Sequence, residues 1–107
     1  PRHAKYFRDA DIIAGDFHFI RRYMPERLEG KGIVTNTVTA DDVAALRRAG
    51  AAFLVTTTPN LNGRSFGTNV VEATLVALSG RRPEELSAGD YLDLIERVGF
   101  RPRVERF

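Results

Sequence analysis

The fold of this chain is decided by residues 53–72, FLVTTTPNLNGRSFGTNVVE. The run opens as a buried β-strand, and Pro59 ends that strand because proline cannot donate to a sheet ladder. The dipeptide Asn62-Gly63 predicts a turn, and Gly67 permits a backbone conformation that a Cβ would block. Asn69 is a good helix N-cap, with a glutamate in the capping-box position three residues later. The stretch therefore predicts a strand, a short polar loop and a helix N-terminus.

This loop is a candidate anion site. A strand, a polar loop and a helix start together bring backbone N–H groups and the helix dipole to one point. Arg64 adds a guanidinium fork that suits phosphate or carboxylate, although a loop arginine can equally bond a helix carbonyl. We expect two or more backbone N–H groups of residues 62–69 to meet there, with Arg64 within reach of a phosphate or phosphorylated ligand.

Composition places the chain among single globular domains. It has 107 residues, 43% of them apolar and 28% charged, which argues against disorder. The net charge of +2 comes without a basic tract, so a nucleic-acid partner is not expected. The absence of cysteine excludes disulfides and thiolate metal sites, and suits a cytoplasmic location. No apolar run reaches membrane-spanning length. The sequence begins at Pro1, so we expect a trimmed leader or a longer parent protein.

The rest of the chain repeats the strand–helix unit. Strands are predicted at residues 11–16, 33–38 and 52–57, and helices at 17–24, 40–49, 69–79 and 88–98. Residues 1–7 are expected to be irregular, and residues 100–107 to pair as an edge strand. Short apolar strands without polar alternation are typical of parallel strands covered on both faces. The pattern predicts a single α/β domain over residues 1–107, three-layered, with a short parallel sheet and C-terminal helices.

The predicted helix at residues 69–79 is apolar nearly all round, which is typical of a helix covered on more than one side. We expect the last segment of the chain to supply part of the cover. We expect the remaining apolar surface to be buried against a second copy or a missing domain, and the protein to be a homo-oligomer or part of a larger chain.

Ligands of an open parallel sheet bind just outside the carboxyl ends of the strands. The candidate residues at these ends are Asp16, Asn36, Thr57, Thr58, Asn62, Gly63, Arg64, Ser65, Gly67, Thr68 and Asn69. Their hydroxyls and amides suit a phosphate, a nucleotide or a polyol. Other roles stay open, because threonine is common in strands and asparagine in turns. Asp16 could serve as the base partner of His18, but a helix N-cap and a packing histidine explain the pair with fewer assumptions.

The motifs of common enzymes are missing from the sequence. It has no G-x-G-x-x-G, no Walker lysine, no G-x-S-x-G elbow and no metal-ligand cluster. The two histidines, His3 and His18, share no ligand spacing. A complete active site is not visible, and no catalytic residue or metal is predicted.

Three segments resemble the C-terminal part of a poorly characterised bacterial family labelled quinate or shikimate 5-dehydrogenase-like. They are ADIIAGDF (residues 10–17), GIVTNTVT (32–39), and VTTTP with GRSFGTN (55–59 and 63–69). The resemblance runs from about residue 6 onward, and GRSFGTN is its most specific part. It implies a Rossmann-like fold, an additional N-terminal region and a link to NAD(P). The Lys/Asp pair and the Gly-rich loop of true quinate and shikimate dehydrogenases are not found in this sequence.

Three functions follow as hypotheses. In the first, the chain is the C-terminal half of a dehydrogenase-like enzyme that binds an anionic or nucleotide-type ligand. In the second, it is a ligand-binding or regulatory module without chemistry. In the third, it is a structural half-domain that completes a sheet.

Overall fold

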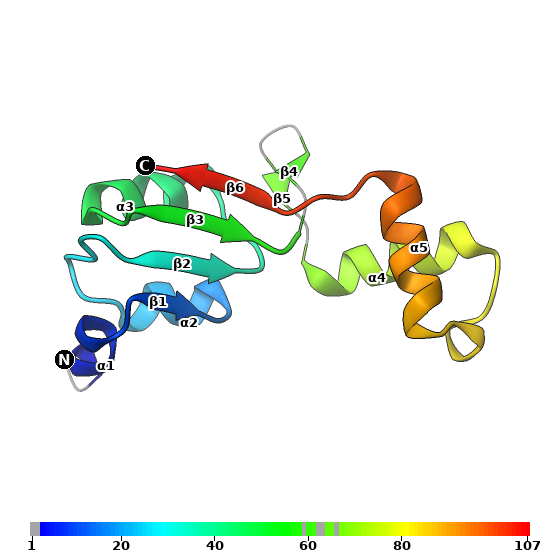
Figure 1. The fold of residues 1–107 in the computed structure, drawn as a ribbon, viewed down its shortest axis with the longest axis horizontal. Coiled ribbons are helices and arrows are strands. Elements are labelled where there is room, and N and C mark those ends of the chain that lie inside the picture. The colour runs from blue at the N-terminus through cyan, green and yellow to red at the C-terminus, as the bar shows by residue number, and fades with distance from the viewer. Residues whose placement is uncertain (1–2, 59, 62–63, 66) are drawn as a thin grey trace.

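The computed structural model describes residues 3–58, 60–61, 64–65 and 67–107 and shows a mixed α/β chain (Figure 1). The helices are α1 (Ala4–Asp9), α2 (Phe17–Tyr23), α3 (Ala40–Ala49), α4 (Thr68–Ser79) and α5 (Ala88–Val98), with a short 3₁₀ helix η1 (Pro83–Glu85). The strands are β1 (Ile12–Ala14), β2 (Gly32–Thr35), β3 (Phe53–Thr56), β4 (Asn60–Leu61), β5 (Arg64–Ser65) and β6 (Arg103–Arg106).

Four of these strands form an open sheet in the order β1-β2-β3-β6. The parallel, adjacent arrangement predicted for the first three strands is confirmed. The tail pairs antiparallel with β3 as an edge strand, which is also confirmed. β4 and β5 form a separate two-stranded hairpin. The predicted turn residues Asn62 and Gly63 lie outside the described residues.

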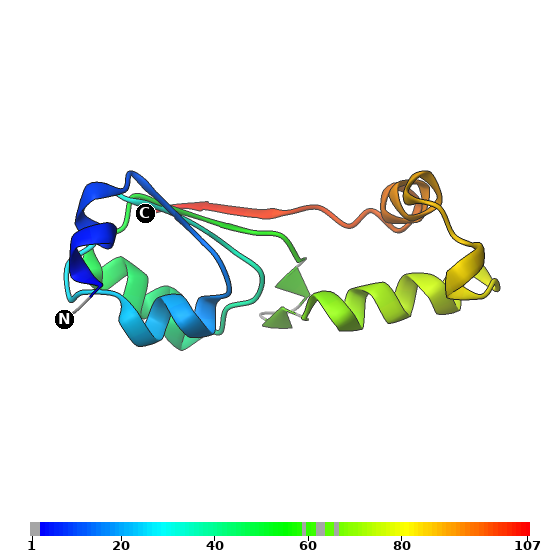
Figure 2. The same ribbon diagram turned by 90° about the horizontal axis from the view of Figure 1, so that it is seen from below.

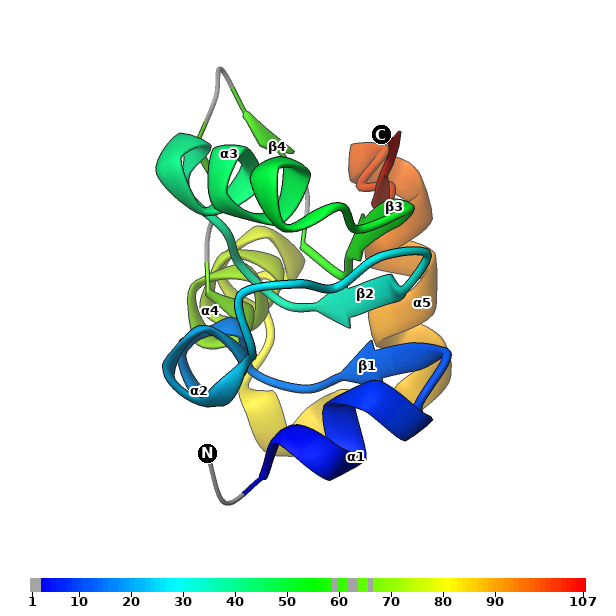
Figure 3. The same ribbon diagram turned by 90° about the vertical axis from the view of Figure 1, so that its left-hand side faces the viewer.

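Helices α2 and α3 lie on the same face of the sheet (Figures 2 and 3). Two crossovers of the same hand that step in the same direction, from β1 to β2 to β3, place both helices on one side. Over the described residues no helix packs on the opposite face, where Ile12 is 57% and Val104 64% exposed. The expected three-layer arrangement is therefore not formed within this part of the chain, which has two layers.

The core lies between the sheet and these two helices. Ile13, Ile33 and Leu54 are cross-strand neighbours on the covered face, and all three are buried. From the helices, the buried side chains against them are Phe17, Ile20, Val43 and Leu46. This single interlayer core fixes the positions of the strand ends.

The predicted irregular start of the chain is instead the helix α1, so that prediction was wrong. Phe7 packs on the core from this helix. The Lys31 ammonium donates to the carbonyl oxygens of Arg8 (2.8 Å) and Ala10 (2.7 Å), at the end of α1 where carbonyls lack partners within the helix. Contacts with residues more than twenty positions away thus stabilise a helix too short to be stable alone.

Most predicted helix ends are confirmed. Thr39 and Ser87 begin α3 and α5 with complete capping boxes, and Gly50 and Gly99 end them in the left-handed conformation. The start of α4 differs from the prediction. Its N-cap is Gly67, at φ −63° and without a side-chain cap, so Asn69 lies inside the helix and Gly67 needs no special backbone conformation.

Residues 68–99, comprising α4, η1 and α5, form a helical arm that extends away from the sheet (Figures 1 and 2). The chain measures 47 × 27 × 18 Å, with a radius of gyration of 15.9 Å. A compact domain of this length would have a radius of gyration of about 13 Å. The arm is the reason for the difference. Leu75 is the buried residue of α4, while Val70 and Leu78 are 51% and 60% exposed, so the residues that the structure describes do not supply the expected cover on several sides of α4.

Candidate functional site

A hollow of about 350 Å³ lies at the carboxyl ends of β1 and β2. It is lined by Asp16, Phe17, His18, Arg21, Asn36, Thr37, Asp42 and Gly67. These residues come from the two loops that follow β1 and β2, from α2 and α3, and from the residue before α4. The position is the one where open parallel sheets bind ligands.

Asp16 and Asn36, both predicted site residues, meet in this hollow. Asp16 is the N-cap of α2, and its Oδ1 accepts a hydrogen bond from the backbone N–H of His18 at 2.9 Å. Its Oδ2 accepts from Asn36 Nδ2 at 3.1 Å. Asn36 Oδ1 in turn accepts from the backbone N–H of Thr37 at 2.7 Å. These bonds hold the carboxylate and the carboxamide side by side, twenty residues apart in sequence.

An ion pair between α2 and α3 adds two residues that the sequence did not indicate as site residues. Arg21 Nη1 donates to Asp42 Oδ1 at 2.9 Å, and the side chains are 44% and 22% exposed. The capping box holds Asp42, because its Oδ2 accepts from the backbone N–H of Thr39. No local pattern shows this pairing, because Arg21 is in the last turn of α2 and Asp42, 21 positions later, is in the first turn of α3.

His18 also lines the hollow. The sequence favoured a partly buried packing histidine here, and that interpretation was wrong about burial, because His18 is exposed. Its ring contacts the exposed ring of Phe19 edge-on, with centroids 6.5 Å apart. The imidazole is therefore accessible to a ligand.

The matched family model covers residues 1–107 and carries the description "Domain of unknown function (DUF8754)". The chain belongs to this family. Comparisons with curated proteins and with solved structures gave no match.

In this DUF8754 chain, the threonines at the strand ends serve the fold. The Thr35 hydroxyl donates to the Gly15 carbonyl at 2.6 Å, and the buried Thr58 hydroxyl donates to the Asn36 carbonyl at 2.6 Å. Thr56, also buried, donates to the carbonyl of Thr58. These bonds tie the loops after β1, β2 and β3 together, and thus hold Asn36 in place. Neither Thr58 nor the exposed Thr57 lines the hollow.

Among the described residues that follow β3, one lines the hollow. Gly67 lines it, while Thr68 and Asn69 lie in the first turn of α4 and do not. Asn62 and Gly63 lie outside the described residues, and Arg64 and Ser65 are described only through the backbone of β5. The predicted anion site of residues 62–69 and the role of Arg64 therefore stay predictions.

Among the residues that the structure describes, the hollow carries two carboxylates, one guanidinium and one imidazole. With the histidine neutral, the formal charge of these four groups is −1, which disfavours a dianion such as phosphate. Carboxylates accept hydrogen bonds from hydroxyl groups, and a guanidinium donates to their oxygens. The arrangement therefore suits a polar ligand with several hydroxyl groups better than a free phosphate.

Neither a metal centre nor a membrane-crossing helix is found in the part of the chain that the structure describes. Over residues 3–58, 60–61, 64–65 and 67–107, no group of three or more acidic or histidine side chains is placed to hold a metal ion. In the same ranges, none of the helices combines the length and the apolar character that crossing a membrane requires.

Proposed function

We propose that this chain is a Rossmann-like small-molecule-binding domain whose ligand carries several hydroxyl groups, such as a polyol, a hydroxylated ring or the ribose of a nucleotide. The observation that carries the proposal is the shared hollow of about 350 Å³, in which the Asp16 carboxylate and the Asn36 carboxamide are hydrogen-bonded to each other. A carboxylate at the end of a parallel strand is well placed to accept from vicinal hydroxyls.

Each lining group has a role. Asp16 accepts from ligand hydroxyls, since a carboxylate has about four acceptor positions and the bonds to His18 and Asn36 use two. Arg21 donates to ligand oxygens with N–H groups beyond the one bonded to Asp42. Phe17, which also lines the hollow, is 3% exposed, so it supports the hollow from the core.

The link to quinate or shikimate dehydrogenase-like proteins stays a prediction. It fits a hydroxylated ring as ligand, and NAD(P) as a nucleotide-type ligand, but the family of this chain has no assigned function. The alternative is a structural half-domain. It is favoured by the fact that Asp16, Asn36 and Asp42 all hold parts of the backbone in place.

The test is an amide-resolved NMR titration of the chain with shikimate, quinate, ribose, NAD(P) and inorganic phosphate. We expect the hydroxylated compounds to shift the amides of residues 16–18 and 36–37, and phosphate to shift them least. Asp16→Asn keeps a good N-cap but removes the charge. It should weaken binding by about 10-fold or more, because a charge-assisted hydrogen bond contributes about 1.5–3 kcal/mol.

The matched control is Asp41→Asn, in the first turn of α3 but outside the hollow. It should leave binding unchanged. If no hydroxylated compound shifts these amides, or if Asp16→Asn and Asp41→Asn bind equally well, the proposal is wrong and the structural alternative is favoured.

A further inference from the structure

Two apolar surfaces of this chain have no cover within the described residues. The first is the sheet face opposite α2 and α3, here called the open face. Cross-strand pairing places two rows on it, Ile12–Gly32–Phe53–Arg106 and Ala14–Val34–Val55–Val104. A shallow groove of about 570 Å³ runs over its β3–β6 side. Parallel strands with apolar residues on both faces are found almost only where both faces are covered.

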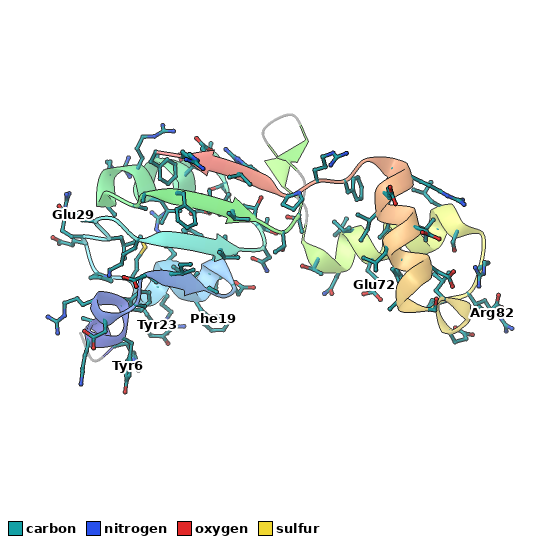
Figure 4. All side chains as sticks on the ribbon, viewed as in Figure 1. Tyr6, Phe19, Tyr23, Glu29, Glu72 and Arg82 are labelled. Atoms are coloured by element: carbon teal, nitrogen blue, oxygen red, sulfur yellow. The ribbon has the colours of Figure 1, made fainter. Side chains whose placement is uncertain are left out.

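The second surface belongs to the helical arm, residues 68–99. Its exposed large apolar side chains are Val70, Leu78, Leu92 and Val98. The arm contacts itself through α4 and α5, while the sheet packs with α2 and α3 (Figures 1 and 2). In Figure 4, Glu72 lies on α4, and Arg82 lies in the turn after α4, at the end of the arm away from the sheet. Within one copy the arm therefore leaves the open face uncovered.

We propose that the arm of one copy packs on the open face of a second copy, and that the second copy returns the same contact. Figure 2 shows α5 at the level of the sheet, with α4 on the side of α2 and α3. The open face and the outer side of α5 thus border the same side of the molecule. A two-fold axis between the sheet half and the arm brings each arm onto the other copy's sheet.

Charge supports a second copy as the occupant. The arm carries six carboxylates and three arginines, a net charge of −3, and two of those arginines pair with carboxylates inside the arm. Because the whole chain has a net charge of +2, the remaining residues carry +5. The acidic arm of one copy is attracted to the basic remainder of another copy. A contact between two arms, or between the remainders of two copies, would instead bring like charges together.

The length of α5 also fits. This helix, rather than α4, lies on the side of the open face (Figure 2). Its 11 residues make it roughly 17 Å long, close to the width of four strands at a spacing of about 4.8 Å. The reciprocal arrangement makes this contact twice.

Disulfide trapping tests the contact, since the chain has no cysteine of its own. Leu92→Cys on the arm and Val104→Cys on the open face replace residues that are 67% and 64% exposed, so both variants should fold. Mild oxidation of a mixture of the two should join one chain of each variant through their introduced thiols. The double variant should give a covalent dimer. Leu92→Cys mixed with Arg48→Cys, on the exposed end of α3, should give no more cross-link than chance collisions.

Sedimentation equilibrium supplies the second measurement. The natural chain should sediment at twice its own mass. Val104→Asp or Leu92→Asp should raise the dimer dissociation constant by about 10-fold or more, because each substitution would place a charge in the apolar contact. Phe19→Asp is the matched control, since Phe19 is 60% exposed but lies on α2 (Figure 4). It should leave the constant unchanged.

Three outcomes overturn the proposal. A disulfide within one chain of the double variant shows an arm folded onto its own sheet. A natural chain that sediments as a monomer shows that no second copy binds. A dimer in which Leu92→Cys cross-links to itself at least as well as to Val104→Cys shows that arm contacts arm.

Discussion

Gly32 offers a sharp test of the packing on the open face. A Cβ at this position would lie 2.6 Å from Phe53 Cε1 and Cε2, and closer still to Cζ, so the ring of Phe53 lies flat across the glycine of the neighbouring strand. The Gly32 backbone is outside the left-handed region, so alanine adds no backbone strain, and the three atoms nearest to its Cβ all belong to the Phe53 ring. Gly32→Ala must push the Phe53 ring off its place.

The size of the effect follows from the burial of that ring. A fully buried phenylalanine covers about 150–250 Å², and Phe53 is half-buried, so roughly 100 Å² is affected. At about 25 cal/mol per Å², the displacement costs up to about 2.5 kcal/mol. Alanine offsets about 0.5–1 kcal/mol of this, because glycine is unfavourable in a strand. We therefore expect Gly32→Ala to lower the free energy of unfolding by about 1–2 kcal/mol.

A double-mutant cycle separates the ring from other causes. With Phe53→Ala as background, Gly32→Ala should become neutral or stabilising by up to about 1 kcal/mol. Urea unfolding followed by far-UV circular dichroism measures all four proteins, at one protein concentration, because association would add to the apparent stability. If Gly32→Ala costs the same with and without the Phe53 ring, the reasoning is refuted.

Three further changes probe the core, a helix cap and the response to acid. Leu54→Ala should cost about 3–5 kcal/mol in urea unfolding, because this fully buried side chain lies in a central strand; a cost near ~1 kcal/mol would contradict that packing. Thr39→Ala should cost about 1 kcal/mol by removing the cap of α3, and Asp41→Ala clearly less. The pKa of Asp90 lies below its usual 3.8, mainly because the carboxylate accepts a hydrogen bond from the backbone N–H of Ser87 and, to a smaller extent, because it interacts with the Ser87 hydroxyl. Since the folded-state pKa is depressed, the stabilisation is fully present above the usual value and is lost as pH falls through the folded pKa. Asp90→Asn should flatten this acid loss in unfolding curves; an unchanged slope would contradict the assignment.

The sequence determined the features that depend on neighbours along the chain. Three apolar strands, separated by helices with few loop residues, sufficed to predict their parallel pairing. The capping boxes at Thr39 and Ser87 were readable because a cap and its partner are three residues apart. Asp16 and Asn36 could be expected to meet, since both follow strands that end at one edge of the sheet.

The tertiary structure decided what depends on distant residues. Helix α1 forms because Phe7 reaches the core and Lys31 binds its last carbonyls. The hydroxyl of Thr58 is used by the Asn36 carbonyl, a contact that no local pattern shows. Apolar residues on both faces of β1–β3 indicated that both faces need cover. Because the hydrophobic effect is non-directional, the pattern does not show which segment covers which face. Only the folded chain shows that, among the described residues, helices cover one face of the sheet and leave the other face and several apolar side chains of the arm exposed.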